Sequence, residues 1–220
     1  MLGRLRALVT PWRQGLAKPL VRAGIRPDVL TLAAIPLAAG AAMAIISRHP
    51  VLGFVLACLA VLVDLVDGEV ARLTQRTSPF GNCLDAIVDR VVEGMLLVAL
   101  APASPLAAST ALLGCVLVSY IKARVGLVIV SDNQDWPGVG DRSDRVVLIL
   151  LAVLLSTSAW RPWNRPVVEV ILWALAALCA VACLQRLVHA LHLVRQAERS
   201  GGLLPYLQEP SAASPPPPTS

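Results

Sequence analysis

Long apolar segments dominate this chain and limit what it can fold into. Of its 220 residues, 56% are hydrophobic and only 15% are charged, whereas about a quarter of the residues in a soluble domain are charged. An apolar run of about 18 residues or more is typical of a helix that crosses a membrane. The sequence therefore predicts an all-α integral membrane protein. A soluble bundle with an unusually apolar core is the disfavoured alternative.

The apolar runs predict six transmembrane helices within one domain, residues 27–196. Turn-forming and charged residues separate the runs. The predicted spans cover residues 29–47, 52–73, 81–100, 106–130, 143–156 and 167–194. The domain is followed by a segment rich in proline and serine, 197–220, which we expect to be disordered because such a composition cannot form a packed core.

A basic segment, residues 1–26, precedes the domain. Its basic side chains are Arg4, Arg6, Arg13, Lys18, Arg22 and Arg26. This pattern favours an amphipathic helix that lies on an anionic membrane surface. A solvated, positively charged N-terminus that only sets the topology is a compatible alternative. No uninterrupted apolar stretch with a small-residue cleavage site follows Met1 closely, so we expect no cleaved signal peptide.

The distribution of basic residues predicts the orientation in the membrane. One side would carry the basic N-terminus together with Arg72, Arg76, Lys122, Arg124, Arg142, Arg145, Arg195 and Arg199, and the other side only Arg48, Arg161 and Arg165. Because cytoplasmic loops carry an excess of Lys and Arg, the first side is predicted to face the cytoplasm, from a cell (inner or plasma) membrane. Trp160 and Trp163 would then anchor the outer interface.

Four aspartates interrupt the second and third apolar runs close to the predicted cytoplasmic surface. Asp64 and Asp67 are three residues apart, and Asp85 and Asp89 are four apart, so each pair lies on one face of its helix. A short loop joins the two helices, which lets the pairs converge. Uncompensated carboxylates in a membrane are costly unless they are neutralised or bind cations. Oxygen ligands favour Mg²⁺, Mn²⁺ or Ca²⁺, and four carboxylates suit two such ions, an arrangement that stabilises phosphoryl displacement.

The residues around the aspartates agree with a phosphate-bearing ligand. Gly68 and Ala71 leave space beside the first aspartate pair, and Gly81 does the same before the second. Arg72, one turn after Gly68, is placed to meet phosphate. Salt bridges from the aspartates to neighbouring arginines are the purely structural alternative. Glu69 is expected to face the headgroups, and Glu93 to support the site or pair with Arg90.

The residues match the signature of a known family. The signature reads Asp64-x2-Asp67-Gly68-x2-Ala71-Arg72-x8-Gly81-x3-Asp85-x3-Asp89. It resembles that of the CDP-alcohol phosphatidyltransferases, and the layout of six spans extends the resemblance over most of the chain. The resemblance implies a membrane enzyme that displaces CMP from a CDP-linked lipid with an acceptor alcohol.

The resemblance also implies roles for individual residues. Asp64, Asp67 and Asp85 would be ligands of two divalent ions, Mg²⁺ or Mn²⁺, and Asp89 would be both a ligand and the general base. The implied CDP-binding residues are Pro27, Asp28, Val29, Gly68, Ala71, Arg72, Ser78 and Gly81. The implied donor is CDP-diacylglycerol, with CDP-archaeol or a soluble CDP-alcohol left open. A homodimer is also implied, although the sequence itself carries no clear dimer motif.

Further stretches resemble one branch of the family, the phosphatidylinositol-phosphate synthases and their archaeal relatives. These are GIRPDVLT (24–31), SYIKAR (119–124), DRSDR (141–145) and CLQRL (183–187). The last three of these stretches contribute a basic cluster near the cytoplasmic end that needs an anionic partner. We expect Lys122, Arg142, Arg145 and Arg186 to bind the phosphate of an acceptor such as inositol phosphate. The acidic residues Asp132 and Asp135 depart from that branch, so glycerol 3-phosphate, serine or another polyol stays open as acceptor.

Other functions are less favoured by the sequence. A cation transporter could use the aspartates as an ion path, but it would predict paired broken helices and gives no role to Gly68 or Arg72. An inactive scaffold would not need the full aspartate set. No nucleic-acid motif is present, so the expected partners are the donor lipid, the acceptor and membrane lipids. The five cysteines, Cys58, Cys83, Cys115, Cys179 and Cys183, are expected to be small core residues.

Overall fold

The protein is an all-helical bundle. The computed structural model describes residues 2–129, 136, 138–202 and 204, with side chains from Trp12 onward. The helices within these residues are α1 (Leu2–Arg22), α2 (Pro27–Ile46), α3 (Pro50–Leu73), α4 (Pro79–Leu100), α5 (Pro105–Val125), α6 (Arg142–Leu154) and α7 (Val167–Ser200), with a short 3-10 turn, η1 (Pro162–Asn164), before α7.

Proline marks the start of four of these helices. Pro27, Pro50, Pro79 and Pro105 occupy the first turns of α2, α3, α4 and α5. Proline suits this position because its fixed φ is helical and its missing N–H would have no intrahelical partner there. At α4 the N-cap Ser78 adds a side-chain cap, since its Oγ accepts a hydrogen bond of 3.0 Å from the Gly81 N–H. Each helix start is therefore encoded locally.

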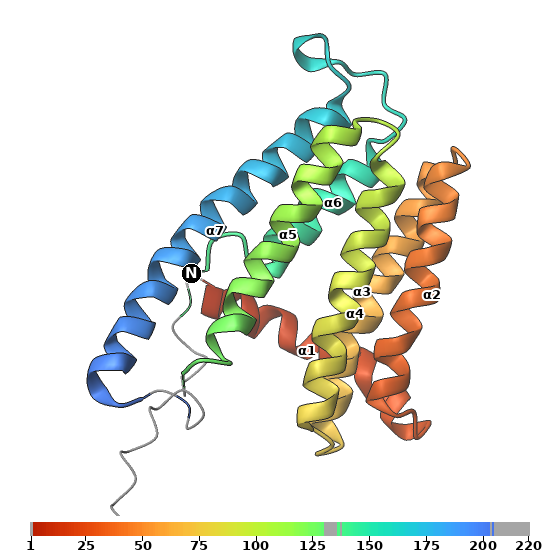
Figure 1. Ribbon diagram of the computed structural model, residues 1–220. Helices are drawn as coiled ribbons and strands as arrows, with labels where there is room; N and C mark the ends of the chain where they lie inside the picture. The colour runs from red at the N-terminus through yellow and green to blue at the C-terminus, as the bar shows by residue number, and fades with distance from the viewer. Residues whose placement is uncertain (1, 130–135, 137, 203, 205–220) are drawn as a thin grey trace, which may run out of the picture.

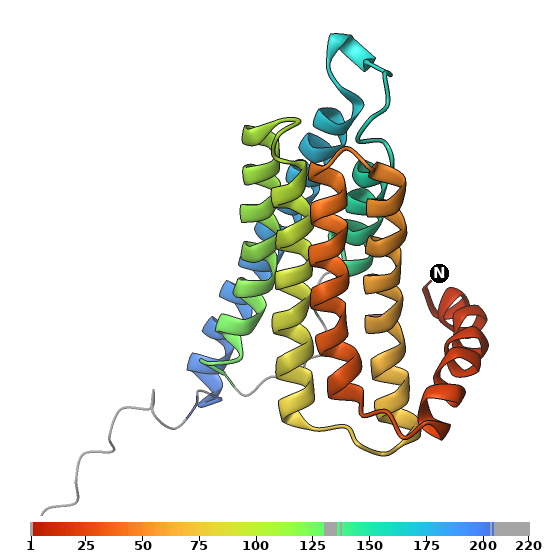
Figure 2. The same ribbon diagram turned by 90° about the vertical axis from the view of Figure 1, so that its right-hand side faces the viewer.

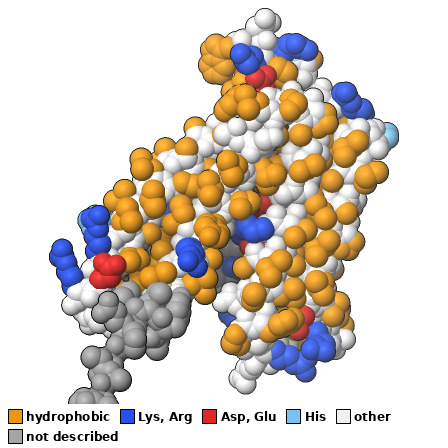
Figure 3. Space-filling model, in the orientation of Figure 1, with side chains coloured by type: hydrophobic (Ala, Val, Ile, Leu, Met, Phe, Trp, Pro, Cys, Tyr) orange, Lys and Arg blue, Asp and Glu red, His pale blue; other side chains and the backbone are white. Residues whose placement is uncertain are grey.

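The helices form two groups that pack on each other. Helix α2 packs on α3 and α4, and α5 packs on the long helix α7. The groups meet where α4 packs on α5 and through the short helix α6, which contacts α3, α4 and α7 (Figure 1). Hydrophobic side chains cover most of the face in Figure 3, basic ones gather at its ends, and charged ones are visible in the recess between the groups. A hydrophobic exterior with charge inside is the pattern of a membrane protein.

Small residues let the helices approach closely. Ala34, Ala38 and Ala41 form a buried stripe along α2. A Cβ added to Gly114 of α5 would lie 2.6 Å from the Cβ of Cys179 on α7. Helices in membranes associate through such close backbone packing because lipid offers no hydrophobic drive between them. Cys115 and Cys179 are buried here, as expected for small core residues, whereas Cys83 is exposed.

Within the part of the chain that the structure describes, four helices are long and apolar enough to cross a membrane: α2, α3, α5 and α7. Two further predicted spans are helices that do not meet this criterion. Helix α4 carries four charged residues, Asp85, Asp89, Arg90 and Glu93, and α6 has 13 residues, a length of about 20 Å against a hydrocarbon core of about 30 Å. The predicted fourth span, 106–130, was too long, because α5 ends at Val125 before the turn at Gly126.

The structure also describes the N-terminal segment and part of the C-terminal segment, which can be compared with the predictions for them. Helix α1 lies outside the bundle, beside α3 (Figure 2). It packs against α3, where Ala17 is fully buried and Arg13 donates a hydrogen bond of 3.3 Å to the Leu65 carbonyl. At the other end, α7 continues to Ser200, so residues 197–200 are helical rather than part of a tail. The rest of the predicted tail, from 205 onward, and the acidic residues Asp132 and Asp135 lie outside the described residues.

Candidate active site

The helix arrangement brings three of the four aspartates into one cluster. Asp64 and Asp67 face inward from α3, and Asp85 faces them from α4. One carboxylate oxygen of each lies within 4.8 Å of the others. Asp67 is buried, and the buried Oδ1 of Asp64 has no hydrogen-bond partner. Three converging carboxylates with an unsatisfied buried oxygen form a set of hard ligands that fits a divalent cation.

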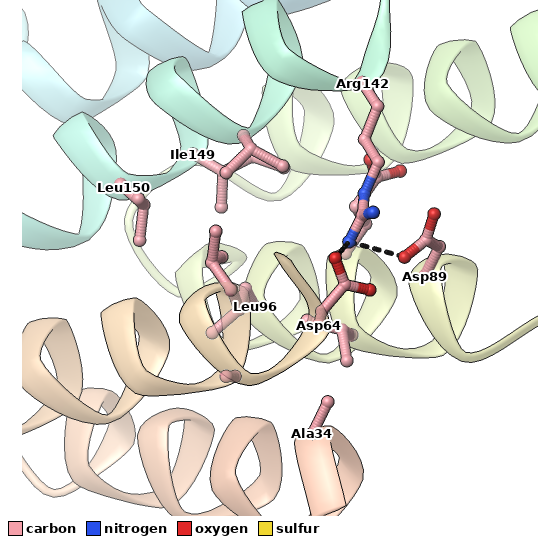
Figure 4. Close-up of a pocket in the computed structure, with 12 residues that line it drawn as sticks. Ala34, Asp64, Asp89, Leu96, Arg142, Ile149 and Leu150 are labelled. Atoms are coloured by element: carbon pink, nitrogen blue, oxygen red, sulfur yellow. Dashed lines mark ion pairs between the residues drawn. The ribbon is translucent and has the colours of Figure 1, made fainter. Parts of the chain in front are cut away.

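Asp89, the fourth aspartate, pairs with an arginine from another helix. Figure 4 shows Arg142 reaching from the start of α6 to a point between Asp64 and Asp89. Its Nη2 lies 2.6 Å from Asp64 Oδ2 and 2.5 Å from Asp89 Oδ1. Asp89 is 7% exposed, so the guanidinium supplies charge balance that buried carboxylates require. Arg142 was predicted to bind an acceptor phosphate, and its present partners are the two aspartates.

A threonine that the sequence reasoning did not single out completes the aspartate cluster. Thr31 of α2 is buried, and its hydroxyl donates a hydrogen bond of 2.5 Å to Asp67 Oδ2. This contact fixes one carboxylate oxygen of Asp67 beside the cluster. The signal was present in the PDVLT stretch, where Thr31 lies one helical turn after Pro27.

An open cavity of about 610 Å³ adjoins the cluster at this end of α2, α3 and α4. Seven of the eight residues predicted to bind CDP line it: Pro27, Asp28, Gly68, Ala71, Arg72, Ser78 and Gly81. Asp67 and Asp85 also line it, so the cavity and the aspartates form one continuous site. The exception is Val29, which is 55% exposed and outside this lining. Its side chain leaves the α2 helix in a different direction from those of Asp28 and Thr31.

The glycines keep the cavity open. A Cβ at Gly68 would meet only the tip of the Arg72 side chain, at 3.9 Å. At Gly81 a Cβ would lie 3.3 Å from Ser78 Oγ and 3.6 Å from Asp28 Oδ1. A side chain at either position would therefore occupy the cavity rather than the helix core. The space is suited to a bulky polar ligand that approaches the backbone closely.

The prediction that Glu69 faces the headgroups was wrong. Glu69 is 6% exposed, and its Oε2 lies 2.6 Å from Nη2 of Arg72. The positions are three apart on α3, so the pair lies on one face of the helix. The Arg72 side chain is 55% exposed, which leaves it available to the cavity while the glutamate limits its freedom. Glu69 thus orients a residue of the cavity wall.

The four basic residues predicted to bind an acceptor phosphate are not equivalent. Arg186 of α7 lies 2.8 Å from Asp141 Oδ1 and donates to the Val118 carbonyl at 3.0 Å. Lys122 lies near Arg186 and Asp141, and both charges interact electrostatically with its ammonium group. These residues and Arg142 come from α5, α6 and α7, as predicted.

Arg145 differs from the other three. Its side chain is 3% exposed, and it pairs with Glu93 and the Gly140 carbonyl. The expected pairing of Glu93 with Arg90 is confirmed at 2.8 Å, and Arg145 is its second partner. Sequence reasoning could not find this second contact, because it joins α4 to α6 across 52 positions.

The protein is a helical membrane protein in which a carboxylate cluster adjoins a cavity lined by arginine, glycine and hydroxyl groups. The fold and the site therefore define the class of phosphate-transferring membrane enzymes. The chain belongs to the CDP-alcohol phosphatidyltransferase family, whose sequence model matches residues 25–194. The predicted family and enzyme class are thereby confirmed.

Individual relatives show which members of the family this chain is similar to. The chain is 32% identical to the phosphatidylinositol phosphate synthase of Mycolicibacterium smegmatis, over 84% of this chain and 86% of the relative. It is 31% identical to the archaetidylinositol phosphate synthase of Aeropyrum pernix, over 79% and 87% of the two chains. Both belong to the branch whose motifs the sequence resembles.

Solved structures of one relative match the fold. The Mycobacterium tuberculosis phosphatidylinositol phosphate synthase with bound CDP-DAG superposes with a TM-score of 0.66 at 28% identity, covering 81% of this chain and 92% of that one. The same enzyme in complex with manganese and citrate gives a TM-score of 0.65 at 26% identity, covering 81% and 88%.

Proposed function

We propose that this enzyme transfers a phosphatidyl group from CDP-diacylglycerol to inositol phosphate and releases CMP. The observation that carries the proposal is the continuity between the aspartate cluster and the cavity, since Asp67 and Asp85 belong to both. A cytidine diphosphate in the cavity would have its phosphates beside the carboxylates. The relatives named as phosphatidylinositol phosphate synthases, and the solved complex with CDP-DAG, support the choice of substrates.

Two divalent ions, Mg²⁺ or Mn²⁺, are the proposed cofactors. Asp64, Asp67 and Asp85 would hold one ion, and Asp89 would join the set for the second. The hard oxygen donors and the unpartnered Oδ1 of Asp64 support this fit, and the related enzyme has been solved with manganese. Bound divalent ions would neutralise the pyrophosphate charge and align the attacking oxygen.

In the proposed reaction the acceptor hydroxyl attacks the phosphorus that carries diacylglycerol. Asp89 takes the hydroxyl proton, a new O–P bond forms, and the P–O bond to CMP breaks, so CMP leaves with the electron pair. Asp89 is suited to this role because it is buried at the end of the cluster where Arg142 enters. Arg72, Ser78 and the glycine-lined wall would hold the nucleotide, and positioning of the two substrates would supply much of the acceleration.

Lys122, Arg142 and Arg186 are the proposed contacts for the acceptor phosphate. They come from three helices, and Arg142 places a positive charge 2.5 Å from Asp89. An acceptor phosphate held by these side chains would bring its hydroxyls toward the base. Arg145 does not join this set, because its partner Glu93 is 4% exposed, whereas Asp141, the partner of Arg186, is 54% exposed.

The proposed setting is a cell membrane with the site facing the cytoplasm. The excess of basic residues at the cavity end supports this orientation. We propose that α4 and α6 complete six membrane-embedded helices, their charged ends shielded by the site. Helix α1 would lie in the interface, where its contacts with α3 hold it against the bundle. Homodimerisation is proposed from the family resemblance alone.

The test is CMP release by the purified protein in detergent with CDP-diacylglycerol and Mg²⁺ or Mn²⁺. The acceptor panel comprises inositol phosphate, free inositol, glycerol 3-phosphate and serine. Release with inositol phosphate alone, abolished by EDTA and restored by the metal, is the expected result. Release with a different acceptor would keep the reaction and overturn the acceptor. No release with any acceptor would overturn the donor assignment.

A further inference from the structure

We propose that Glu93 and Arg145 are positioning residues that aim Arg142 at the reacting centre. The inference rests on the proposed function, because its kinetic consequence is an effect on the acceptor. Neither residue lies in the family signature, and neither faces the nucleotide cavity. Together they form a buried ion pair, with side-chain exposures of 3% and 4%, that links α4 to α6.

Arg145 fixes the beginning of α6 through two contacts. Its Nη2 lies 3.2 Å from Glu93 Oε1, and its Nη1 donates a 2.9 Å hydrogen bond to the Gly140 carbonyl. Arg142 and Arg145 are three residues apart in the first turn of the helix, so they share a face. An anchor at Arg145 therefore sets the rotation of the turn from which Arg142 reaches the aspartates.

The loop before α6 is held in place independently. Gly140 has φ +67°, and a Cβ there would lie 2.6 Å from the Cβ of Ala182 on α7. Its N–H donates to Asp144 Oδ2 at 3.2 Å. With the loop seated on α7 and Arg145 held by α4, little freedom remains for the first turn of α6.

Glu93 reaches the base by a second route. Its Oε2 holds Nη1 of Arg90 at 2.8 Å, and the same Nη1 donates to Ser119 Oγ at 2.7 Å. The Nη2 of Arg90 lies 3.6 Å from Asp89 Oδ2. Each oxygen of Glu93 thus holds an arginine: one orients Asp89, and the other anchors the helix that carries Arg142. A single carboxylate sets the relative position of base and acceptor site.

A direct role for Arg145 in acceptor binding predicts an effect of opposite sign. If Arg145 were an acceptor ligand, the negative charge of Glu93 would weaken anion binding there, and Glu93→Gln would lower the KM for inositol phosphate. If Glu93 positions Arg142 through Arg145, the same substitution releases the first turn of α6 and raises that KM. The geometry favours the second outcome because both terminal nitrogens of the Arg145 guanidinium already have partners.

The kinetic experiment compares Glu93→Gln, Arg145→Met and their double variant with the unmodified enzyme. We expect each single variant to raise the KM for inositol phosphate about tenfold or more, because small displacements of a positioning group are costly, while the KM for CDP-diacylglycerol stays within twofold. The double variant should match the worse single variant, since both lose the same contact. Arg145→Lys, which keeps the charge, should retain the fold and give an intermediate KM. Glu169→Gln, which removes the partner of Arg165 at the far end of α7, is the matched control and should change neither constant.

A distance measurement tests the pair without activity. Spin labels at the exposed positions Ile87 on α4 and Val147 on α6 report the separation of the two helices. The distance distribution should be narrow in the unmodified protein and in Glu169→Gln, and broadened in Glu93→Gln. An unchanged distribution, a lowered acceptor KM, or losses that multiply in the double variant would each overturn the inference. An enzyme inactive with every acceptor but with the expected distances would instead overturn the proposed function.

Discussion

At the scale of single residues, the site is a balance of buried charge. Asp64 and Asp89 share Arg142, Asp89 also meets Arg90, and Asp67 accepts a hydrogen bond from Thr31. Removing one partner from such a network leaves an uncompensated charge or an unpaired polar group. The most informative substitutions therefore keep the shape of the side chain and change only its charge or hydrogen bonding.

Asp89→Asn should abolish transfer while leaving the donor bound. The amide cannot take the acceptor proton, but Asp89 lies outside the lining of the cavity proposed for CDP. CMP release should fall by at least about a thousandfold, by comparison with other lost catalytic groups. Binding of CDP-diacylglycerol, measured by protection against thermal unfolding, should be retained. Turnover close to that of the unmodified enzyme would remove Asp89 from the role of base.

Thr31→Val should weaken metal dependence without a large change in structure. Valine matches threonine in shape but cannot donate to Asp67 Oδ2. Loss of a hydrogen bond to a metal ligand typically costs about 10- to 100-fold in affinity or activity. The concentration of Mg²⁺ that gives half-maximal CMP release should rise by about tenfold. Thr110→Val is the matched control, because the Thr110 hydroxyl is exposed and donates to the Leu106 carbonyl of its own helix. An equal effect there would refute the role of Thr31.

At the scale of the helices, much of the fold could be predicted from the sequence. All six spans predicted from the apolar runs are helices in the structure. Four of these helices start at a proline that lies within two residues of the predicted start. Two boundaries could not be predicted: the end of α5 at Val125 and the continuation of α7 to Ser200. In both places the local sequence is compatible with a helix that stops and with one that continues. The contacts that the helix end makes in the folded protein determine where it stops.

Gly114→Ala should destabilise the contact between α5 and α7. The added methyl would lie 2.6 Å from the Cβ of Cys179, which is backbone-proximal and cannot move freely. Overpacking of this kind costs about 1–3 kcal/mol, so the thermal unfolding temperature in detergent should fall by several degrees. Gly94→Ala is the control, since its methyl would meet only the Leu112 Cδ1 at 3.8 Å. A fall of equal size in both variants would mean that close packing at Gly114 is not the cause.

At the scale of the whole molecule, the cavity and the basic residues lie at the same end of the bundle. This end holds the exposed Cys83, in the first turn of α4. A membrane-impermeant maleimide should label Cys83 in inside-out vesicles and not in sealed right-side-out vesicles. Ser158→Cys in a Cys83→Ser background places an exposed thiol at the opposite end and should show the reverse pattern. Labelling of Cys83 from the outside would place the site away from the cytoplasm.

The sequence by itself determined the helical membrane class, the four aspartates and most of the lining of the cavity proposed for CDP. These features depend on local spacing: apolar runs set the helices, and intervals of three and four residues put the aspartates on one face. Seven of the eight residues predicted to bind CDP line the cavity for the same reason, because they lie on helix ends joined by short connections.

Only the tertiary structure decided which charges meet. Arg142 and Arg145 are three residues apart and looked alike in the sequence, yet one reaches Asp64 and Asp89 and the other is enclosed by Glu93 and Gly140. The partners lie on different helices, so the pairing depends on the rotation and depth of each helix in the bundle. Those quantities are set by side-chain packing between helices, which local periodicity does not encode.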